Sequence, residues 1–362
     1  KYANDRMHYF NPDTTLMYIN NTFRQQEIYA SLAGKYAILP RWDINLSVDY
    51  QWNTLSSDMK NFAFPRRNTV LSALATAFEW QRFKAQASIL GTFVSENVAN
   101  VQDKQEFTPA IFASFQPFAA HNFILRAFYK HIFRMPTFND LYYTDIGNIA
   151  LKPEYTTQYN LGFMYHKAYQ HGIIRALDVR ADAYYNEVRD KIVAIPKGNG
   201  QYRWMMMNLG YVEIRGVDVS AQIEWKPANG IRINTSINYT FQKAQDFTLL
   251  ENNTKAKWFG GQIAYIPRHN GSAIANASWM TWDLNYSFIY VGERYHNSDN
   301  IADNHEQPWY THDLTVSKSF AFTKVKTKIS VEVNNILNQY YDVVLNYPMP
   351  GRNFKIILKM EM

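Results

Sequence analysis

The amino-acid sequence predicts an all-β chain: a transmembrane antiparallel β-barrel to which these residues contribute about 16 strands. Three observations predict it. Segments of about 9 to 17 residues alternate apolar and polar side chains, the pattern of a strand with one apolar and one polar face. Aromatic residues make up 16% of the 362 residues. Short turns alternate along the chain with long polar loops, as they do in outer-membrane barrels.

The last stretch, Lys328 to Met362, shows the alternation most clearly. Ile329 and Val331 alternate with polar residues, and the apolar positions resume at Phe354 and continue to Met362. A terminal strand of this kind needs a partner on each side, because an unpaired edge tends to associate with other chains. We expect closure of a barrel to provide both partners.

Earlier segments repeat the pattern, beginning with a strand expected at Tyr2 to Tyr9. Between Trp42 and Trp52 every second residue is apolar, and the segments around Ile231 and Trp282 behave in the same way. Aromatic residues at the two ends of one strand are typical of two membrane interfaces. A soluble β-sandwich would instead bury the same apolar faces in its core, so alternation alone leaves both architectures open.

The connections predict an orientation. Short ones are expected near 39–41, 81–82, 116–118, 168–170, 227–230, 280–281 and 321–323, and long ones near 53–66, 97–105, 135–154, 190–208, 243–261, 293–309 and 337–353. Outer-membrane barrels have short turns in the periplasm and long loops outside the cell. By that rule the C-terminus is periplasmic.

Composition excludes several classes of protein. Mean hydropathy is −0.38 and no run of about 18 apolar residues occurs, so no transmembrane helix is expected. The chain has no cysteine, which excludes disulfides and thiolate metal sites. The net charge of +6 is spread along the chain without a basic block for nucleic acid. No catalytic motif is recognisable, and neither an enzyme nor a cofactor is predicted.

Two motifs stand out, one at residues 334–341 followed by 347–352 and the other at residues 133–143 followed by 147–154. The first resembles the closing motif, and the second the mid-barrel motif, of one family, the TonB-dependent outer-membrane receptors. The chain departs from many bacterial barrels in ending with Met362 rather than Phe or Trp. The residues taken from the two motifs are Arg134, Pro136, Asn139, Leu141, Tyr347, Pro348, Pro350, Gly351 and Arg352.

The resemblance implies a barrel of about 22 strands with a plugged lumen. Residues 1–362 would then be one partial barrel domain, with the plug and the first strands outside this chain. The implied function is active import of a scarce large solute across the outer membrane of a Gram-negative bacterium, with cobalamin favoured and haem or a ferric siderophore next. The implied partners are the TonB complex (through the plug), the plug segment, outer-membrane lipid, the small-molecule solute and a surface lipoprotein acting as a lid.

Two other functions stay open from the sequence: a passive porin-like channel, and a soluble all-β binding or adhesion protein. A porin would explain a chain with 16 strands, but it would leave the two receptor motifs unexplained. A soluble protein would need no detergent for extraction. No nucleic-acid partner is expected under any of these interpretations.

Candidate ligand contacts lie in the long loops, although each could instead serve packing of the loop or of a strand end. The loop around His296 and His305 is rich in groups that could contact haem or a cation, but its spacing matches no metal motif, so no metal site is predicted. Polar residues such as Asp43 and Asp49 are expected to face a hydrated interior. The loop candidates are Tyr142, Tyr143, Asp145, Trp204, Met206, His296, His305 and Tyr310.

Overall fold

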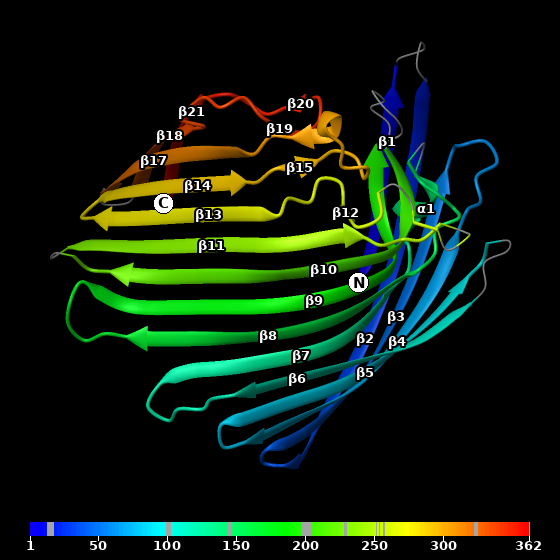
Figure 1. The fold of residues 1–362 in the computed structure, drawn as a ribbon, viewed down its shortest axis with the longest axis horizontal. Helices are drawn as coiled ribbons and strands as arrows, with labels where there is room; N and C mark the ends of the chain where they lie inside the picture. The colour runs from blue at the N-terminus through cyan, green and yellow to red at the C-terminus, as the bar shows by residue number, and fades with distance from the viewer. Residues whose placement is uncertain are drawn as a thin grey trace. The chain divides into compact units, whose positions relative to one another are not determined.

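The computed structural model describes residues 1–12, 18–98, 103–143, 146–196, 204–227, 230–250, 252, 254–255, 258–321 and 325–361. The predicted all-β, antiparallel class is confirmed (Figure 1). Within these described ranges, hydrogen bonding joins 17 strands in one sheet and forms two further sheets of two strands each. One of the 17, β12, has only two residues, which leaves the expected 16 longer strands.

The large sheet contains β1 (Tyr2–Asn11), β2 (Ile19–Leu39), β3 (Trp42–Ser57), β4 (Arg66–Trp80), β5 (Phe83–Glu96), β6 (Lys104–Phe115), β7 (Asn122–Arg134), β8 (Glu154–Ala168), β9 (Ile174–Pro196), β10 (Trp204–Trp225), β11 (Ile231–Asp246), β12 (Gly261–Gln262), β13 (His269–Trp279), β14 (Trp282–Val291), β17 (Trp309–Ala321), β18 (Lys326–Asn334) and β21 (Asn353–Glu361). The small sheets pair β15 (Arg294–Tyr295) with β16 (His305–Glu306), and β19 (Asp342–Val344) with β20 (Tyr347–Pro348). A short helix α1 (Phe138–Tyr142) and a 3-10 turn η1 (Ala302–Asn304) lie in loops. Among the described residues, no helix has the length and apolar character needed to cross a bilayer.

The expected alternation of short and long connections is confirmed. Two residues separate β2 from β3, β4 from β5, and β13 from β14. The last two turns contain Gln81 and Met280, each with a φ of 53°. Positive φ values of this kind match the right-handed twist of a tight hairpin. The long connections include residues 58–65, 135–153, 292–308 and 335–352.

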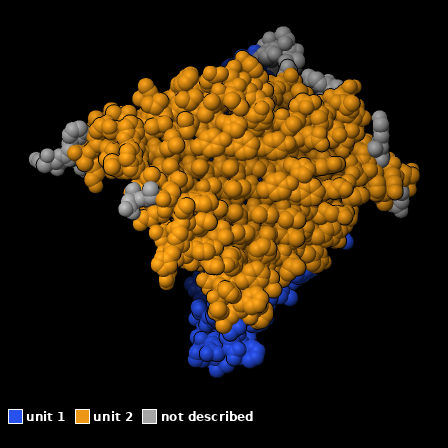
Figure 2. Space-filling view, turned by 60° about the vertical axis from the view of Figure 1, so that its left-hand side comes forward, with its two compact units in different colours: residues 1–114, 128–158, 188–209 blue, residues 115–127, 159–187, 210–362 orange. Residues whose placement is uncertain are grey.

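The chain divides into two compact units, coloured separately in Figure 2. Unit 1 comprises residues 1–114, 128–158 and 188–209, and unit 2 comprises residues 115–127, 159–187 and 210–362. In unit 1, β1 to β5 pair antiparallel in chain order. In unit 2, β11, β13, β14, β17, β18 and β21 follow one another in the same antiparallel way.

One face of the unit 1 strands is apolar and exposed. On β2 this apolar face includes Leu32 and Tyr36, which are 78% and 71% exposed. On β3 it includes Trp42 and Trp52, ten residues apart. At about 3.4 Å per residue and the tilt of about 45° usual for membrane barrels, this spacing corresponds to about 24 Å along a bilayer normal, close to the height of the apolar band of outer-membrane barrels.

The final strands of unit 2 show the same exposure. Ile329 is opposite Leu358 and Val331 is opposite Ile356, so the apolar positions expected in the two segments lie on one face of the sheet. These side chains are between 40% and 78% exposed. A sandwich would have buried them against a second sheet. Large exposed apolar surfaces indicate contact with another apolar phase.

Candidate functional site

A cavity of about 420 Å³ lies on the polar face of unit 1, the face opposite the exposed apolar side chains. Strands β2 to β5 form most of it, and the segment that begins the loop between β7 and β8 completes it. The alternation at period two places every second residue of each strand toward this cavity. The lining residues are Gln25, Glu27, Gln51, Asn53, Arg67, Thr69, Leu71, Leu90, Thr92, Val94, Phe133, Met135, Thr137 and Phe138.

A carboxylate held by two amides forms one wall of the cavity. Gln51 Nε2 and Asn53 Nδ2 donate to the same oxygen of Glu27, at 3.0 and 3.2 Å. The strand register brings them together, because Glu27 is directly opposite Asn53. The Lys1 ammonium lies 3.8 Å from the other Glu27 oxygen. The wall therefore offers oriented amide and carboxylate groups to a polar solute.

A buried ion pair lies next to the cavity. Arg67 and Glu96 are cross-strand partners, and their side chains are 10% and 2% exposed. The Arg67 Nε and Nη2 groups donate to one Glu96 oxygen at 3.2 and 3.0 Å. Nη1 donates to the Pro136 carbonyl at 2.7 Å, and the guanidinium lies 4.9 Å from the centre of the Phe138 ring. One arginine thus joins two strands to the loop that follows β7.

That loop carries the mid-barrel motif, and several motif residues form the hydrogen bonds and close contacts that fix the loop's conformation. Thr137 caps α1 and exchanges two hydrogen bonds with Asp140. Arg134 lies 3.1 Å from the Asp140 carboxylate, and the Asn139 carbonyl accepts from the Tyr143 N–H at 3.3 Å. A Cβ on Gly147 would lie 2.7 Å from the Leu141 carbonyl, so a side chain there would displace backbone.

Two of the loop candidates meet at one apolar cluster in unit 1. Tyr142 and Met206, far apart in the sequence, both pack against a buried cluster formed by Leu141, Leu151 and Ile192. The Met206 N–H also donates to the Ile146 carbonyl at 2.9 Å. Burial raises the pKa of Tyr142 to about 12.

The other loop candidates of unit 1 have different surroundings. The Tyr143 ring lies 5.7 Å from the ring of Tyr9 and 5.8 Å from that of Phe23. Burial raises its pKa as well. Trp204 is half-buried at the start of β10, and Asp145 lies outside the described residues.

The closing motif holds the loop before β21 by side chain to backbone hydrogen bonds. Asn335, with a φ of 51°, donates to the Gln339 carbonyl at 2.8 Å and accepts from the Gln339 N–H at 2.9 Å. It also approaches the Pro350 carbonyl at 3.4 Å. Asn338 accepts from the Arg352 N–H at 2.8 Å, and a Cβ on Gly351 would lie 2.8 Å from the same Asn338 oxygen.

A buried arginine also stabilises this loop by donating hydrogen bonds to backbone carbonyls. Arg294 is 3% exposed, and it donates to the carbonyls of Asp342 at 2.5 Å and Gln307 at 3.3 Å. Burial lowers its pKa, while nearby Glu306 opposes that shift. The motif residues Tyr347 and Pro348 form β20 and pair with β19, which begins at Asp342.

The histidine candidates of unit 2 are paired with carboxylates. His296 Nδ1 lies 2.9 Å from Glu306, and His305 Nε2 lies 3.2 Å from Glu293. Within the described ranges, no group of three or more potential ligands is placed to hold a metal ion. Tyr310, 39% exposed, lies on the face of β17 that carries the exposed Val316.

Sequence reasoning missed the residues that organise the cavity. The alternation places Glu27 and Gln51 on a polar face, but it does not show that their side chains meet. Arg67 and Glu96 are separated by 29 positions and become partners only through the register of β4 and β5. The alternation shows that polar residues line one face of the expected strands, but it does not show which residues of neighbouring strands meet. Among the polar residues singled out, Asp43 pairs with Lys35 at 2.8 Å and Asp49 accepts from Tyr29 at 3.1 Å.

An antiparallel sheet with an exposed apolar face, a polar opposite face and long loops held on the strands defines a β-barrel of the outer-membrane class. The chain belongs to the family described as TonB dependent receptor-like, beta-barrel, whose sequence model matches residues 1–336. The resemblance to this family is therefore confirmed; the match includes the mid-barrel motif and ends at residue 336, near the start of the closing motif.

Curated relatives of the chain include vitamin B12 transporters. The chain is 28% identical over 227 residues to the vitamin B12 transporter BtuB of Photobacterium profundum, covering 59% of this chain and 34% of that protein. It is 21% identical over 325 residues to BtuB of Vibrio cholerae (El Tor Inaba N16961), covering 89% of this chain and 47% of that protein. The chain thus spans about a third to a half of the length of these relatives.

Solved structures share the fold at lower identity. The FrpB iron transporter of Neisseria meningitidis (F5-1 variant) superposes with a TM-score of 0.72 at 12% identity, covering 99% of this chain and 60% of that one. The copper transporter OprC gives 0.71 at 15% identity, with coverages of 98% and 60%. BauA, the ferric preacinetobactin receptor of Acinetobacter baumannii, gives 0.66 at 12% identity, with coverages of 94% and 54%.

Proposed function

We propose that this chain forms most of the wall of a TonB-dependent importer in the outer membrane of a Gram-negative bacterium, and that the solute is cobalamin. One observation carries the proposal: the polar face of β2 to β5 holds a cavity that the mid-barrel loop completes, while the opposite face of the same strands is apolar and exposed. A barrel wall with these two faces would separate membrane lipid from a polar interior through which a solute can pass.

The chemistry of the cavity suits a solute rich in amides. Cobalamin carries several carboxamide groups around an apolar ring. Glu27, Gln51 and Asn53 provide acceptors and donors for carboxamides, and Leu71 and Phe133 provide apolar contacts. Because the cavity is smaller than cobalamin, it would receive only one edge of the molecule. The relatives named vitamin B12 transporters support the same choice, and haem or a ferric siderophore comes next.

We propose that a plug segment lies against the polar face and that TonB acts on the plug. The chain contributes differential binding and gating rather than catalysis. The proposed solute contacts outside the cavity are the loop residues Tyr142, Tyr143, Trp204, Met206, His296 and His305. A surface lipoprotein over the long loops is a further proposed partner.

The test is binding and uptake by the full-length protein. Isothermal titration of the purified protein should show tight binding of cyanocobalamin, with weaker binding of haemin and of a ferric siderophore. Whole-cell uptake should fall to background when TonB is deleted. Uptake that persists without TonB and rises linearly with solute concentration would instead indicate a passive channel.

A matched pair of variants locates the contact. Glu27→Gln removes the charge that orients Gln51 and Asn53, so we expect about a tenfold loss of cyanocobalamin affinity, as for a lost charge-assisted hydrogen bond. Asp43→Asn removes a carboxylate from the same polar face near the short turns and should leave affinity unchanged. Equal affinities for the two variants would exclude the cavity as a contact.

A further inference from the structure

One part of the polar face of unit 2 is built from uncharged residues. It lies on β11, β13, β14 and β17, which follow one another in the sheet (Figure 1). Its residues alternate with exposed apolar residues of the opposite face, such as Ile237 and Leu284. We call this surface the neutral patch, and it is formed by Asn234, Ser236, Ser272, Asn276, Asn285 and Ser287.

Strand register arranges the neutral patch in rows across the strands. Asn234 is opposite Asn276, and Asn276 is opposite Asn285. Asn285 donates through Nδ2 to Asn276 Oδ1, which leaves the Asn276 amino group and the Asn285 carbonyl for other partners. Ile274 and Ile289 lie on the same face and are 37% and 40% exposed. The patch therefore offers neutral hydrogen-bonding groups together with a small apolar surface.

Charged groups border the neutral patch. Toward the short turns, Asp283 accepts from Lys328 at 2.8 Å. On β17, Asp313 accepts from a backbone N–H of the closing-motif loop at 2.7 Å. On β10, Glu224 is opposite Asn234. The fixed charges thus lie around the patch, and its interior has amide and hydroxyl groups only.

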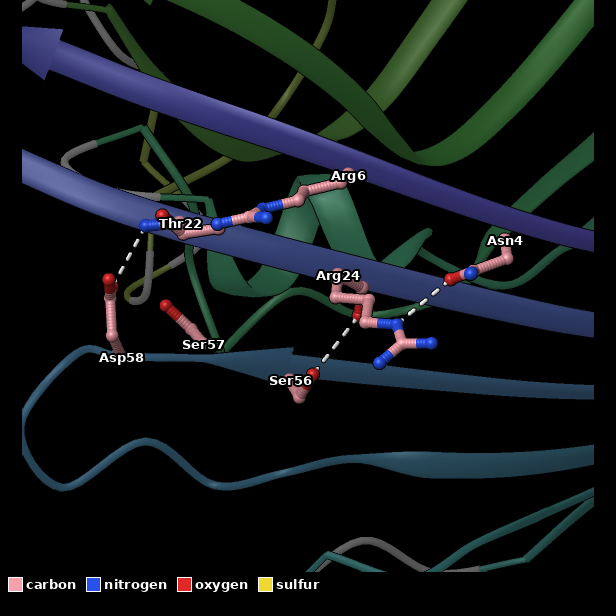
Figure 3. A pocket seen from close by; sticks show the side chains of 7 residues that line it. All are labelled: Asn4, Arg6, Thr22, Arg24, Ser56, Ser57 and Asp58. Atoms are coloured by element: carbon pink, nitrogen blue, oxygen red, sulfur yellow. Dashed lines mark hydrogen bonds between the residues drawn. The ribbon is translucent and has the colours of Figure 1, made fainter.

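The strands of unit 1 carry fixed charges at corresponding positions. On their polar face, Lys35 pairs with Asp43 at 2.8 Å, and Asp49 accepts a hydrogen bond at 3.1 Å. Charges also occur in a cavity on the other face of β1 to β3, where Arg24 donates to Asn4 at 2.9 Å (Figure 3). Removing water from a charged group costs more than removing it from a neutral one, so a solute displaces solvent more easily at the neutral patch.

A surface over which a solute moves must bind the solute and also release it. Hydrogen bonds to charged groups are stronger than those between neutral groups, so fixed charges would hold a polar solute at one place. Amides and hydroxyls allow one weak hydrogen bond to be exchanged for the next. The carboxamides of cobalamin can pair with either group. The neutral patch is therefore suited to passage, whereas the cavity around Glu27 is suited to retention.

We propose that the neutral patch lines the passage that the solute follows through the barrel while the plug is displaced. The occupant is the moving solute rather than the plug itself, because the patch has no charged group that would fix the position of a protein segment. This inference rests on the proposed function, since it requires an importer with a polar interior. It assigns the passage to β11, β13, β14 and β17.

The test is uptake by cells that produce the full-length protein with one bulky substitution. Ser287 and Ser47 form a matched pair: both are half-buried on a polar face, and each lies five residues after the tryptophan that begins its strand. Ser287→Trp should lower TonB-dependent uptake of cyanocobalamin about tenfold, which corresponds to about 1.4 kcal/mol in the barrier to passage. Its affinity for cyanocobalamin, measured by isothermal titration, should stay unchanged. Ser47→Trp should keep wild-type uptake and affinity.

Thiol labelling gives an independent readout. The 362 residues contain no cysteine, so Ser287→Cys and Ser47→Cys each introduce the only thiol among them. Labelling of Ser287→Cys by a membrane-impermeant maleimide should rise several-fold when cyanocobalamin and TonB are both present. Labelling of Ser47→Cys should be the same with and without them. These variants decide the question even where Ser287→Trp fails to fold.

Three results would overturn the proposal. The first is equal uptake by the two tryptophan variants, both with wild-type affinity. The second is loss of affinity in Ser287→Trp together with entry of vancomycin into the cells, because that result would make the patch the seat of the plug. The third is labelling of Ser287→Cys that does not depend on TonB. Uptake by the wild type without TonB would instead refute the proposed function, and the same assay measures it.

Discussion

The loop of residues 135–153 in unit 1 and the loop of residues 335–352 in unit 2 both carry family motifs, yet they are held by different interactions. The first depends on a buried charge pair, Arg67 with Glu96, which also binds the Pro136 carbonyl. The second depends on asparagine side chains and on Arg294, which bind backbone groups. At the first loop, the buried charges of Arg67 and Glu96 each depend on the other for neutralisation. At the second loop, the hydrogen bonds go to several uncharged backbone carbonyls.

This difference predicts different responses to substitution. A buried charge deprived of its partner is costly, because no water replaces the lost interaction. A lost bond to a backbone carbonyl costs less, because the remaining group is neutral. We therefore expect sharp, partner-dependent effects in the first loop and smaller, graded effects in the second.

The largest effect is expected for Arg67→Met, which leaves the Glu96 carboxylate buried without a counter-charge. The free energy of unfolding should fall by about 3–5 kcal/mol. Urea titration of the protein in micelles measures it, and limited proteolysis should show cleavage within residues 135–153. The double variant R67M/E96L, which removes both charges, should recover most of the loss. A double variant no more stable than the single one would contradict the charge-pair account.

Arg294→Met should have the next largest effect. The substitution removes the donors to the Asp342 and Gln307 carbonyls but leaves no buried charge. We expect a loss of about 2 kcal/mol. Hydrogen exchange should rise in residues 335–352 and stay unchanged in residues 135–153. Equal changes in the two loops would mean that they are not held independently.

A smaller loss is expected for Asn335→Ala, which removes two hydrogen bonds to Gln339 from a residue with a φ of 51°. The expected cost is about 1–2 kcal/mol. Asn335→Gly keeps the backbone conformation accessible and should recover the part due to strain. If glycine were no better than alanine, the hydrogen bonds alone would account for the loss.

The smallest effect is a pH response of the first loop. Burial raises the pKa of Tyr142 from 10.0 to about 12, so the folded loop favours the neutral phenol. That contribution is fully present below pH 10 and is lost as the pH rises through about 12. Tyrosinate absorbance should show one fewer late-titrating phenol in Tyr142→Phe than in the wild type. Proteolysis of the loop should rise over the same range, and a late-titrating absorbance unchanged in Tyr142→Phe would contradict the raised pKa of Tyr142.

The sequence alone determined the strands and their two faces. Alternation from Trp42 to Trp52 and from Phe354 onward requires only local backbone geometry, because successive side chains of a strand point to opposite sides. Turn lengths followed from the same segmentation, and the structure confirms them. The two motifs were recognisable because the residues of each lie close together in the chain, and the family match over residues 1–336 confirms the resemblance to the family.

Only the tertiary structure decided which polar residues meet. Glu27 approaches Gln51, and Arg67 approaches Glu96, because strand register aligns positions that are 24 and 29 residues apart. Tyr142 and Met206 share one apolar cluster because the loop after β7 packs beside the start of β10. A pattern of period two specifies a face but not an opposite residue. Register arises from the combined pairing of whole strands, which no single segment contains.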